Sequence, residues 1–352
     1  MSVIYNNRCS EAPVYSDDDV MTSRGFTLVE WLIAMTMGLF LLAGVFSVFV
    51  MSRSSSEDAF DQSELQENGR LAIRLISQDI KWAGFFGAYT GQSTQVGLSL
   101  SLSAGSTVLA ANDCLDERSV GSLPSNAGPA RGLWVSRVSA SKGLAGFACI
   151  LVADRVANTD VISIKRLVGR PVPATEGLNA NRFYMAANSQ EARVIRGTET
   201  RPLFGANNES QTWEYQHYIY YLSQDNGVPV LRKRYLTADG GSSLIGGAMA
   251  EGVEHMVLML GVDDSVIPDG RIDRYMSADQ MTAQRWNEGR VLGVRLFILI
   301  RAAKESARYK NNNTYQLGNL PPIKGNGDGY RRLLLESSIA LRNQQIVTRS
   351  GT

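Results

Sequence analysis

The hydrophobic pattern of the chain is dominated by one long apolar run near its N-terminus. Residues 26–51 are almost entirely hydrophobic and contain a single charged residue, Glu30. A helix of about 20 apolar residues is enough to cross the hydrocarbon core of a bilayer. A carboxylate in such a span costs roughly 2.5–3.5 kcal/mol at mid-bilayer, and less near the interface, so it requires a partner. The run predicts a membrane-spanning helix with a functional acid near its start, or else a simple signal anchor that tolerates one Glu.

Helical periodicity continues beyond the apolar run, over residues 52–83. Apolar side chains recur there at intervals of three and four residues, with charged side chains between them. The segment contains no proline, Gly69 is a candidate bend, and Gly84 and Gly87 provide a stop. The pattern predicts one helix over residues 26–82, whose second half packs an apolar face on a globular domain.

The remaining residues, 84–352, have the pattern of a β-rich domain. Runs of β-branched and aromatic residues alternate there with stretches rich in Gly, Pro, Ser and Asn. The strongest single signal is a hairpin around Asp225-Asn226-Gly227. The expected strands are 160–167, 213–222, 228–236, 254–262, 291–302 and 331–341, with a short helix or turn at 280–290 and loops at 88–110, 111–149, 169–181 and 311–329. We therefore expect an α+β fold, with mostly antiparallel strands laid against the second half of the long helix.

Composition and motifs exclude several classes of function. With 352 residues, 44% hydrophobic and 20% charged, the chain can build a core in addition to an anchor. Its formal net charge is +1 and its basic residues are scattered, so no motif or field points to nucleic acid. The sequence has no phosphate loop or nucleophile elbow, and His217 and His255 lie in strand patterns without a triad partner. We expect no enzymatic activity and no cofactor.

An acidic cluster is the one candidate for a metal site. Asp263, Asp264, Asp269 and Asp273 surround Gly270 and carry the oxygen ligands that calcium prefers. Their spacing does not fit the EF-hand template. We interpret the cluster as a polar turn, with a calcium site as the weaker alternative.

The junction before the apolar run carries a specific motif. Gly25-Phe26-Thr27-Leu28-Val29-Glu30 resembles the class III signal of type IV prepilins and type II secretion pseudopilins. In that family a membrane aspartic peptidase cuts after the glycine, and the new N-terminal phenylalanine is methylated. The resemblance implies cleavage between Gly25 and Phe26, with Glu30 as the fifth mature residue. The Phe26 amine of a neighbouring subunit would then be the natural partner of the Glu30 carboxylate. Trp31 stands where the family usually has leucine.

The resemblance also divides the chain and affects the count of cysteines. It implies a leader (1–25), a transmembrane or filament-core half-helix (26–51), an amphipathic half-helix (52–83) and a periplasmic domain (84–352). The leader contains an unusual acidic run, and translation starts either at Met1 or at Met21. Cleavage would remove Cys9 and leave Cys114 and Cys149. An even pair outside the cytoplasm predicts a disulfide, with two free thiols as the alternative.

Further motifs resemble the PilW family of minor pilins. They are the stretch 68–87, which runs from Asn68-Gly69-Arg70 to Phe85-Phe86-Gly87, the stretch 286–296 and the closing stretch 330–343. Residues 88–210 match no family pattern, and Ala88 stands where many relatives have a cysteine. The family's disulfide pattern therefore cannot be carried over.

The resemblance implies a structural protein: a minor pilin that helps to initiate a type IV pilus and is located at its tip. The implied partners are other minor pilins, the major pilin, the prepilin peptidase, the assembly platform and a tip adhesin. The implied location is the inner membrane, with a periplasmic C-terminal domain, and then the pilus. The alternatives are a minor pseudopilin of type II secretion, or a signal-anchored periplasmic binding domain that never polymerises. Motility, adhesion and DNA uptake all remain open as uses of the pilus.

Overall fold

The structure, a computed structural model, describes residues 25–90, 93–116, 120–204, 210–239 and 243–343. The chain forms two compact units, Met1–Asp58 and Ala59–Thr352. Helix α1 (Leu28–Lys81) contributes its first part to one unit and its last part to the other, so the predicted continuous helix is confirmed. The predicted leader, with Cys9 and both candidate starts, lies outside the described residues except for Gly25.

The first unit consists of the N-terminal part of α1. Among the described residues, α1 is the helix that is long and apolar enough to cross a membrane. Its large apolar side chains from Leu28 to Met51 are mostly exposed. No described residue of this unit covers them, and an exposed apolar surface of this size marks a site of contact with a membrane or with other proteins.

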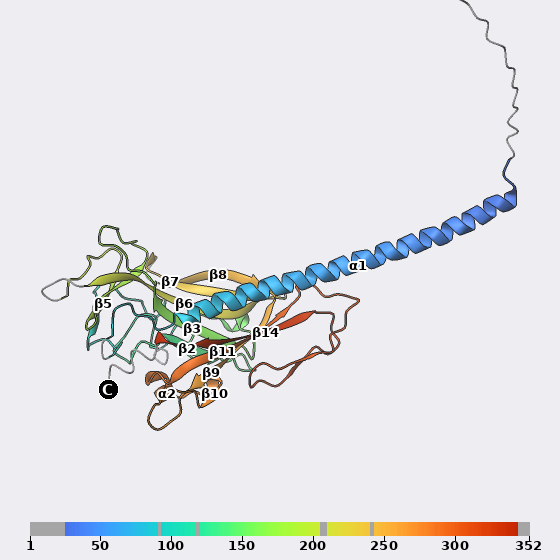
Figure 1. The fold of residues 1–352 in the computed structure, drawn as a ribbon. Helices are drawn as coiled ribbons and strands as arrows, with labels where there is room; N and C mark the ends of the chain where they lie inside the picture. Colours follow the sequence, from blue (N-terminus) through green and yellow to red (C-terminus); the bar gives the residue numbers. More distant parts are fainter. Residues whose placement is uncertain (1–24, 91–92, 117–119, 205–209, 240–242, 344–352) are drawn as a thin grey trace, which may run out of the picture. The chain divides into compact units, whose positions relative to one another are not determined.

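The second unit contains two main β-sheets (Figure 1). The larger sheet has the order β1-β5-β4-β6-β3-β2, with β7 paired to β6 and β8 paired to β7. The smaller has the order β10-β9-β11-β14, and β12 and β13 form a separate pair. The strands are β1 (Leu100–Leu102), β2 (Leu133–Arg137), β3 (Asp160–Leu167), β4 (Phe183–Ala187), β5 (Ala192–Arg196), β6 (Gln211–Asp225), β7 (Val228–Thr237), β8 (Ser243–Glu251), β9 (Val253–Val262), β10 (Arg274–Met276), β11 (Val291–Arg301), β12 (Thr314–Tyr315), β13 (Ile323–Lys324) and β14 (Arg332–Ala340). The short helices are η2 (Val152–Asp154), η4 (Ala278–Gln280) and α2 (Ala283–Asn287).

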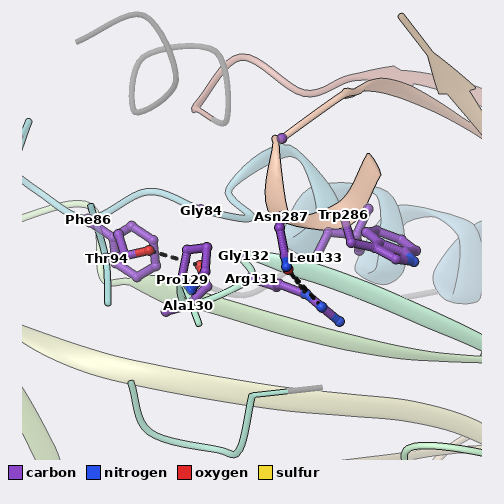
Figure 2. A pocket seen from close by; sticks show the side chains of 11 residues that line it. Gly84, Phe86, Thr94, Pro129, Ala130, Arg131, Gly132, Leu133, Trp286 and Asn287 are labelled. Carbon is purple, nitrogen blue, oxygen red and sulfur yellow. Dashed lines mark hydrogen bonds between the residues drawn. The ribbon is translucent and has the colours of Figure 1, made fainter. Parts of the chain in front are cut away.

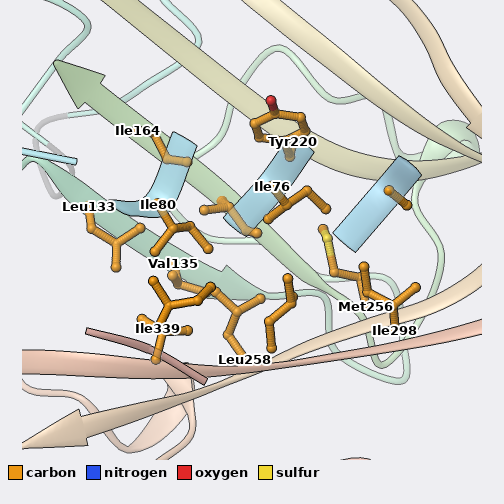
Figure 3. Packing of buried hydrophobic residues seen from close by; sticks show 14 of the residues in the cluster. Ile76, Ile80, Leu133, Val135, Ile164, Tyr220, Met256, Leu258, Ile298 and Ile339 are labelled. Atoms are coloured by element: carbon orange, nitrogen blue, oxygen red, sulfur yellow. The ribbon is translucent and has the colours of Figure 1, made fainter. Parts of the chain in front are cut away.

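The last turns of α1 form the centre of the main hydrophobic core. Leu65, Ala72, Ile76 and Ile80 recur at helical spacing and are buried. They pack among apolar side chains from both sheets, as Figure 3 shows for Ile76 and Ile80. The second half of the helix is therefore an integral core element of the domain, as its periodicity predicts.

Gly69 has a packing role at the contact between α1 and the smaller sheet. The helix continues through it without a break. A Cβ atom built at Gly69 would lie 2.5 Å from Leu335 Cδ1 and 3.4 Å from Ile300 Cδ1. The glycine thus permits close approach to β11 and β14, which the sequence pattern alone presented only as a candidate bend.

The stronger strand predictions agree with the structure. The two-residue turn Asn226-Gly227, with φ of 50° and 82°, joins β6 and β7. Such positive φ values at both central residues are characteristic of a type I′ hairpin turn. The predicted strands at 160–167, 254–262, 291–302 and 331–341 are also present as β3, β9, β11 and β14.

Other parts of the β domain differ from the sequence-based expectation. Strand β2 falls within a stretch that was expected to be loop, and β1 pairs with β5 in parallel. The stretch 311–329 is not simply exposed, because Asn311 and Leu317 are fully buried. Leu317 and Tyr315 cover the outer face of β9 and β11. The side chains on both faces of β9 and β11 are mostly apolar, so each face must pack against other apolar side chains.

Candidate functional site

The segment at the start of α1 places the predicted processing and assembly residues together. Gly25 and Phe26 are exposed, and nothing lies within 4 Å of a Cβ built at Gly25. The Glu30 carboxylate accepts hydrogen bonds from the Thr27 N–H and the Thr27 hydroxyl, both at 3.0 Å. The Thr27 hydroxyl in turn accepts from the Glu30 N–H at 3.2 Å. This reciprocal arrangement is a capping box, which satisfies backbone donors at a helix N-terminus.

A second group of polar residues joins the end of α1 to the larger sheet. The Asp79 carboxylate lies on the buried face of the helix and pairs with Arg166 at 3.0 Å and Lys233 at 2.9 Å. The Tyr220 hydroxyl donates to the same carboxylate at 2.5 Å. Tyr218 adds a cation–π contact, with the Lys233 ammonium 3.5 Å from its ring centroid. These contacts fix the rotation and height of the helix on β3, β6 and β7.

The electrostatics of this group follow from its burial. Burial lowers the pKa of Lys233, while the Asp79 carboxylate opposes that shift. Burial and the adjacent Asp79 raise the pKa of Tyr220, so it remains a neutral donor. The sequence pattern gives one signal for this site, an acidic residue between Ile76 and Ile80 on the buried stripe of the helix, and it does not reveal the partners in the sheet.

The two cysteines of the β domain form a disulfide. Cys114 and Cys149 are bonded, with 4.6 Å between their Cα atoms and a sequence separation of 35. A backbone hydrogen bond of 2.7 Å from Ala148 N to Cys114 O closes the same loop. In the chain-entropy model a crosslink over such a loop stabilises by roughly 4 kcal/mol. It ties together the segments that precede and follow β2, and Phe86, Leu123 and Phe147 from these segments are buried against the outer face of the larger sheet.

The acidic cluster lies in the loop between β9 and β10, where its carboxylates are engaged by the protein itself. Asp263 accepts from the N–H groups of Ser265 and Gly270, and Asp269 from that of Arg271. Asp264 pairs with Arg274 and Arg285, and Asp273 accepts from the Asp264 N–H. Among the described residues, no group of three or more His, Cys, Asp or Glu side chains is arranged to hold a metal ion. The four carboxylates thus act as hydrogen-bond acceptors and ion-pair partners within the loop and its neighbours.

The two histidines occupy β6 and β9. His217 Nε2 lies 2.8 Å from Ser163 Oγ, and both side chains are fully buried. Burial and the nearby Lys165 hold the pKa of His217 well below its usual value, so the ring is neutral. Burial also lowers the pKa of His255. Because solvent does not reach the Ser163–His217 pair, a substrate cannot approach it in this conformation.

A small cavity lies between the end of α1, the start of β2 and α2 (Figure 2). Its volume is about 70 Å³, enough for a few water molecules. On its wall, Arg131 donates to Asn287 Oδ1 at 2.8 Å and stacks 4.4 Å from the Trp134 ring. Burial lowers the pKa of Arg131 to about 10. These contacts fasten α2 to the larger sheet.

Comparison with known proteins gives two family matches. Residues 20–46 match the model described as Prokaryotic N-terminal methylation motif. Residues 219–343 match the model described as Type IV Pilus-assembly protein W. No curated protein and no solved structure matches the chain. The resemblance to PilW-family pilins with a class III signal is confirmed, and the matched regions contain Glu30 and the stretches 286–296 and 330–343.

Proposed function

We propose that this chain, a pilin-like component of type IV pilus assembly anchored by its N-terminal helix, is a minor pilin that initiates the pilus and remains at its tip. One observation carries the proposal: a single chain joins the methylation motif at 20–46 to the PilW region at 219–343. The role is one of assembly rather than catalysis. It places the chain first in the inner membrane, with residues 84–352 in the periplasm, and later in the filament.

The geometry of the N-terminal segment supports the first steps of this proposal. The exposed Gly25-Phe26 bond is accessible to a prepilin peptidase. Before assembly the Glu30 carboxylate is satisfied by Thr27 within its own chain. In the filament the cleaved and methylated Phe26 amine of a neighbour would replace or join these bonds, which gives a charge-assisted pair in apolar surroundings. The exposed apolar side chains between Leu28 and Met51 would then pack on the helices of neighbouring subunits.

The partners follow from the same role. The helix would contact other minor pilins and the major pilin, and the assembly platform would extract the subunit from the inner membrane. The β domain would remain outside the helical core, where a tip adhesin could bind it. A minor pseudopilin of type II secretion would use the same motif and helix, but the PilW match at 219–343 favours the pilus.

The experiment is complementation of a strain that lacks the gene. Deletion should remove or greatly reduce surface pili while the major pilin remains in the inner membrane, and the wild-type gene should restore them. Gly25→Val should leave an uncut precursor. Glu30→Ala should be inserted and cleaved but be absent from sheared pili, because the neighbouring amine loses its partner. Glu67→Ala, which changes an exposed carboxylate on the same helix, is the matched control and should assemble normally.

Two outcomes would contradict the proposal. Normal piliation of the deletion strain would exclude an initiating role. Loss of protein secretion with intact pili would assign the chain to a type II secretion system instead. Normal entry of Glu30→Ala into pili would refute the amine–carboxylate pairing alone.

A further inference from the structure

The loop between β9 and β10, residues 263–273, presents apolar side chains to solvent at its tip. Val266 is 97% exposed and Ile267 is 81% exposed, and Pro268 beside them is also exposed. No other large apolar side chain among the described residues is more exposed than Val266. Two adjacent β-branched side chains held fully in water require an explanation, since a protein ordinarily gains by covering them.

The base of this loop is tied together by its carboxylates. Asp263 accepts hydrogen bonds from Ser265 N at 3.2 Å and Gly270 N at 2.8 Å. Its carboxylate thus links a residue before the tip to a residue after it. Asp273 Oδ2 accepts from Asp264 N at 2.7 Å and from the Ser265 hydroxyl at 3.1 Å. Three of these bonds join the two arms of the loop, and the bond from Ser265 N to Asp263 lies within the first arm.

Arginines from neighbouring elements brace the same base. Asp264 pairs with Arg274 of β10 and, at 2.8 Å, with Arg285 of α2. Arg290 donates to the carbonyl of Ser265 at 2.5 Å. These contacts connect the base of the loop to β10, to α2 and to the residue that precedes β11, so the base has a defined position.

Two glycines in the smaller sheet make room for Ile272, in the part of the loop that leads into β10. Gly261 of β9 and Gly293 of β11 are direct partners in the sheet. A Cβ built at Gly261 or Gly293 would lie 2.8 Å or 3.1 Å from Ile272 Cδ1. Ile272 therefore occupies space that exists because both sheet positions lack a side chain. Glycine weakens a strand interior, so two paired glycines here indicate that seating this loop matters.

We propose that Val266 and Ile267 form a preorganised anchor that inserts into an apolar pocket on a neighbouring pilus subunit. The rigid base reduces the entropy lost on binding, which is the main advantage of preorganisation. Two side chains are too small to form a complete interface, so they act within a contact to which other surfaces contribute.

The charge around the tip favours a protein partner. Four aspartates of the loop (Asp263, Asp264, Asp269 and Asp273) and Glu288, which pairs with Arg290, face four arginines (Arg271, Arg274, Arg285 and Arg290). Surroundings with no excess of positive charge provide no attraction to an anionic lipid surface or to nucleic acid, both of which select basic patches. An apolar pocket on a protein complements the exposed side chains at the tip. The loop also lies within the region 219–343 that matches the PilW model.

The test is site-specific photo-crosslinking of the full chain in piliated cells. A photoreactive phenylalanine analogue replaces Ile267, and in a control strain it replaces Leu151, which is 66% exposed elsewhere on the domain. We expect an adduct with another pilus subunit, at least tenfold more abundant from position 267 than from position 151. Equal yields from the two positions, adducts with lipid alone, or no adduct would overturn the proposal.

A pair of variants gives an independent reading. Val266→Ser with Ile267→Ser should leave the thermal midpoint of the purified full-length protein unchanged, because both side chains are exposed. The same double variant should reduce surface pili at least tenfold, whereas Val266→Ile with Ile267→Val should not. The partner assignment depends on the proposed function, and the two can fail separately. Normal pili in the deletion strain would refute the proposed function. Full rescue of that strain by the serine double variant would refute only the proposed anchoring role of Val266 and Ile267.

Discussion

At the scale of single residues, Asp79 illustrates how one carboxylate can determine where a helix sits. Its contacts with Arg166, Lys233 and Tyr220 all come from the larger sheet. Removing one member of such a buried group leaves the others desolvated and without a counter-charge.

Asp79→Ala should therefore destabilise the domain by about 3 kcal/mol, the lower end of the range for breaking a buried ion pair, because Arg166 and Lys233 keep some solvent contact. Urea unfolding of the purified chain, followed by tryptophan fluorescence, measures the change. Gln78→Ala is the control, since its side chain is exposed one residue away. Equal unfolding midpoints for the two variants would show that the ion pairs are offset by other interactions.

Lys165 provides a residue-scale prediction about pH. The side chain is fully buried in β3, and burial lowers its pKa from 10.5 to about 7, although Asp113 opposes the shift. Between these two values the unfolded chain binds a proton that the folded chain does not. The free energy of unfolding should therefore rise with pH from about 7 to about 10.5.

Lys165→Met should remove this contribution. The difference in unfolding free energy between wild type and variant, measured at several pH values from 7 to 10, should shift in favour of the wild type as the pH rises. Parallel pH profiles would mean that the amine titrates alike in the folded and unfolded chains.

These residues also show what the sequence can reveal. Glu30 could be identified because a charge in an otherwise apolar run is visible without knowing its partner. Ser163 and Lys165 alternate with Ile162 and Ile164 in β3, a pattern that normally indicates a solvent-facing side. In the structure the segments before and after β2 cover that side, and the Lys165 ammonium donates a hydrogen bond to the Gly121 carbonyl, so both polar residues are buried. Strand alternation does not reveal a cover that comes from a distant loop.

At the scale of elements, α1 could be predicted because the helical repeat of its apolar residues is visible within one segment of the sequence. The strands that it contacts could not be predicted, because they lie far away in the chain. Gly69 is recognisable in sequence as a weak point of a helix, but its role depends on Leu335, which is far away in the chain. Short strands such as β4 and β5, with five residues each, give little periodic signal. The parallel pairing of β1 with β5 is likewise determined by chain topology rather than by local pattern.

Gly69→Leu should destabilise the domain by about 1–3 kcal/mol, because the new side chain overpacks the contact with β11 and β14. Gly69→Ala should be nearly neutral, since the gain in helix propensity of about 1 kcal/mol offsets a displacement of the flexible end of Leu335. Gln66→Leu, on the exposed face one turn earlier, is the control. Thermal unfolding of the three variants provides the measurement, and a stability for Gly69→Leu equal to that of wild type would contradict close packing at this position.

At the scale of the whole molecule, the two units obtain their stability in different ways. The unit Ala59–Thr352 buries most of its large apolar side chains in hydrophobic clusters of its own. The unit Met1–Asp58 leaves its apolar side chains exposed over the described residues. The protein therefore needs an apolar environment for one part and water for the other, which is the requirement of a pilin in either the membrane or the filament.

This division leads to a prediction of copy number. In a helical filament the N-terminal helices share a core, so the globular domains must fit side by side at every step. The domain proposed to lie outside this core, residues 84–352, has long segments with only short strands between β1 and β2 and between β11 and β14, which add bulk at each lateral contact. At the end of a filament one face stays unpacked, and a large domain meets no such restriction. We therefore expect a few copies per pilus, independent of filament length.

Quantitative mass spectrometry of sheared pili, fractionated by length, measures the ratio of this chain to the major pilin. The ratio should fall as the filaments lengthen, and a constant ratio would place the chain along the shaft, because only a subunit incorporated at regular intervals scales with length.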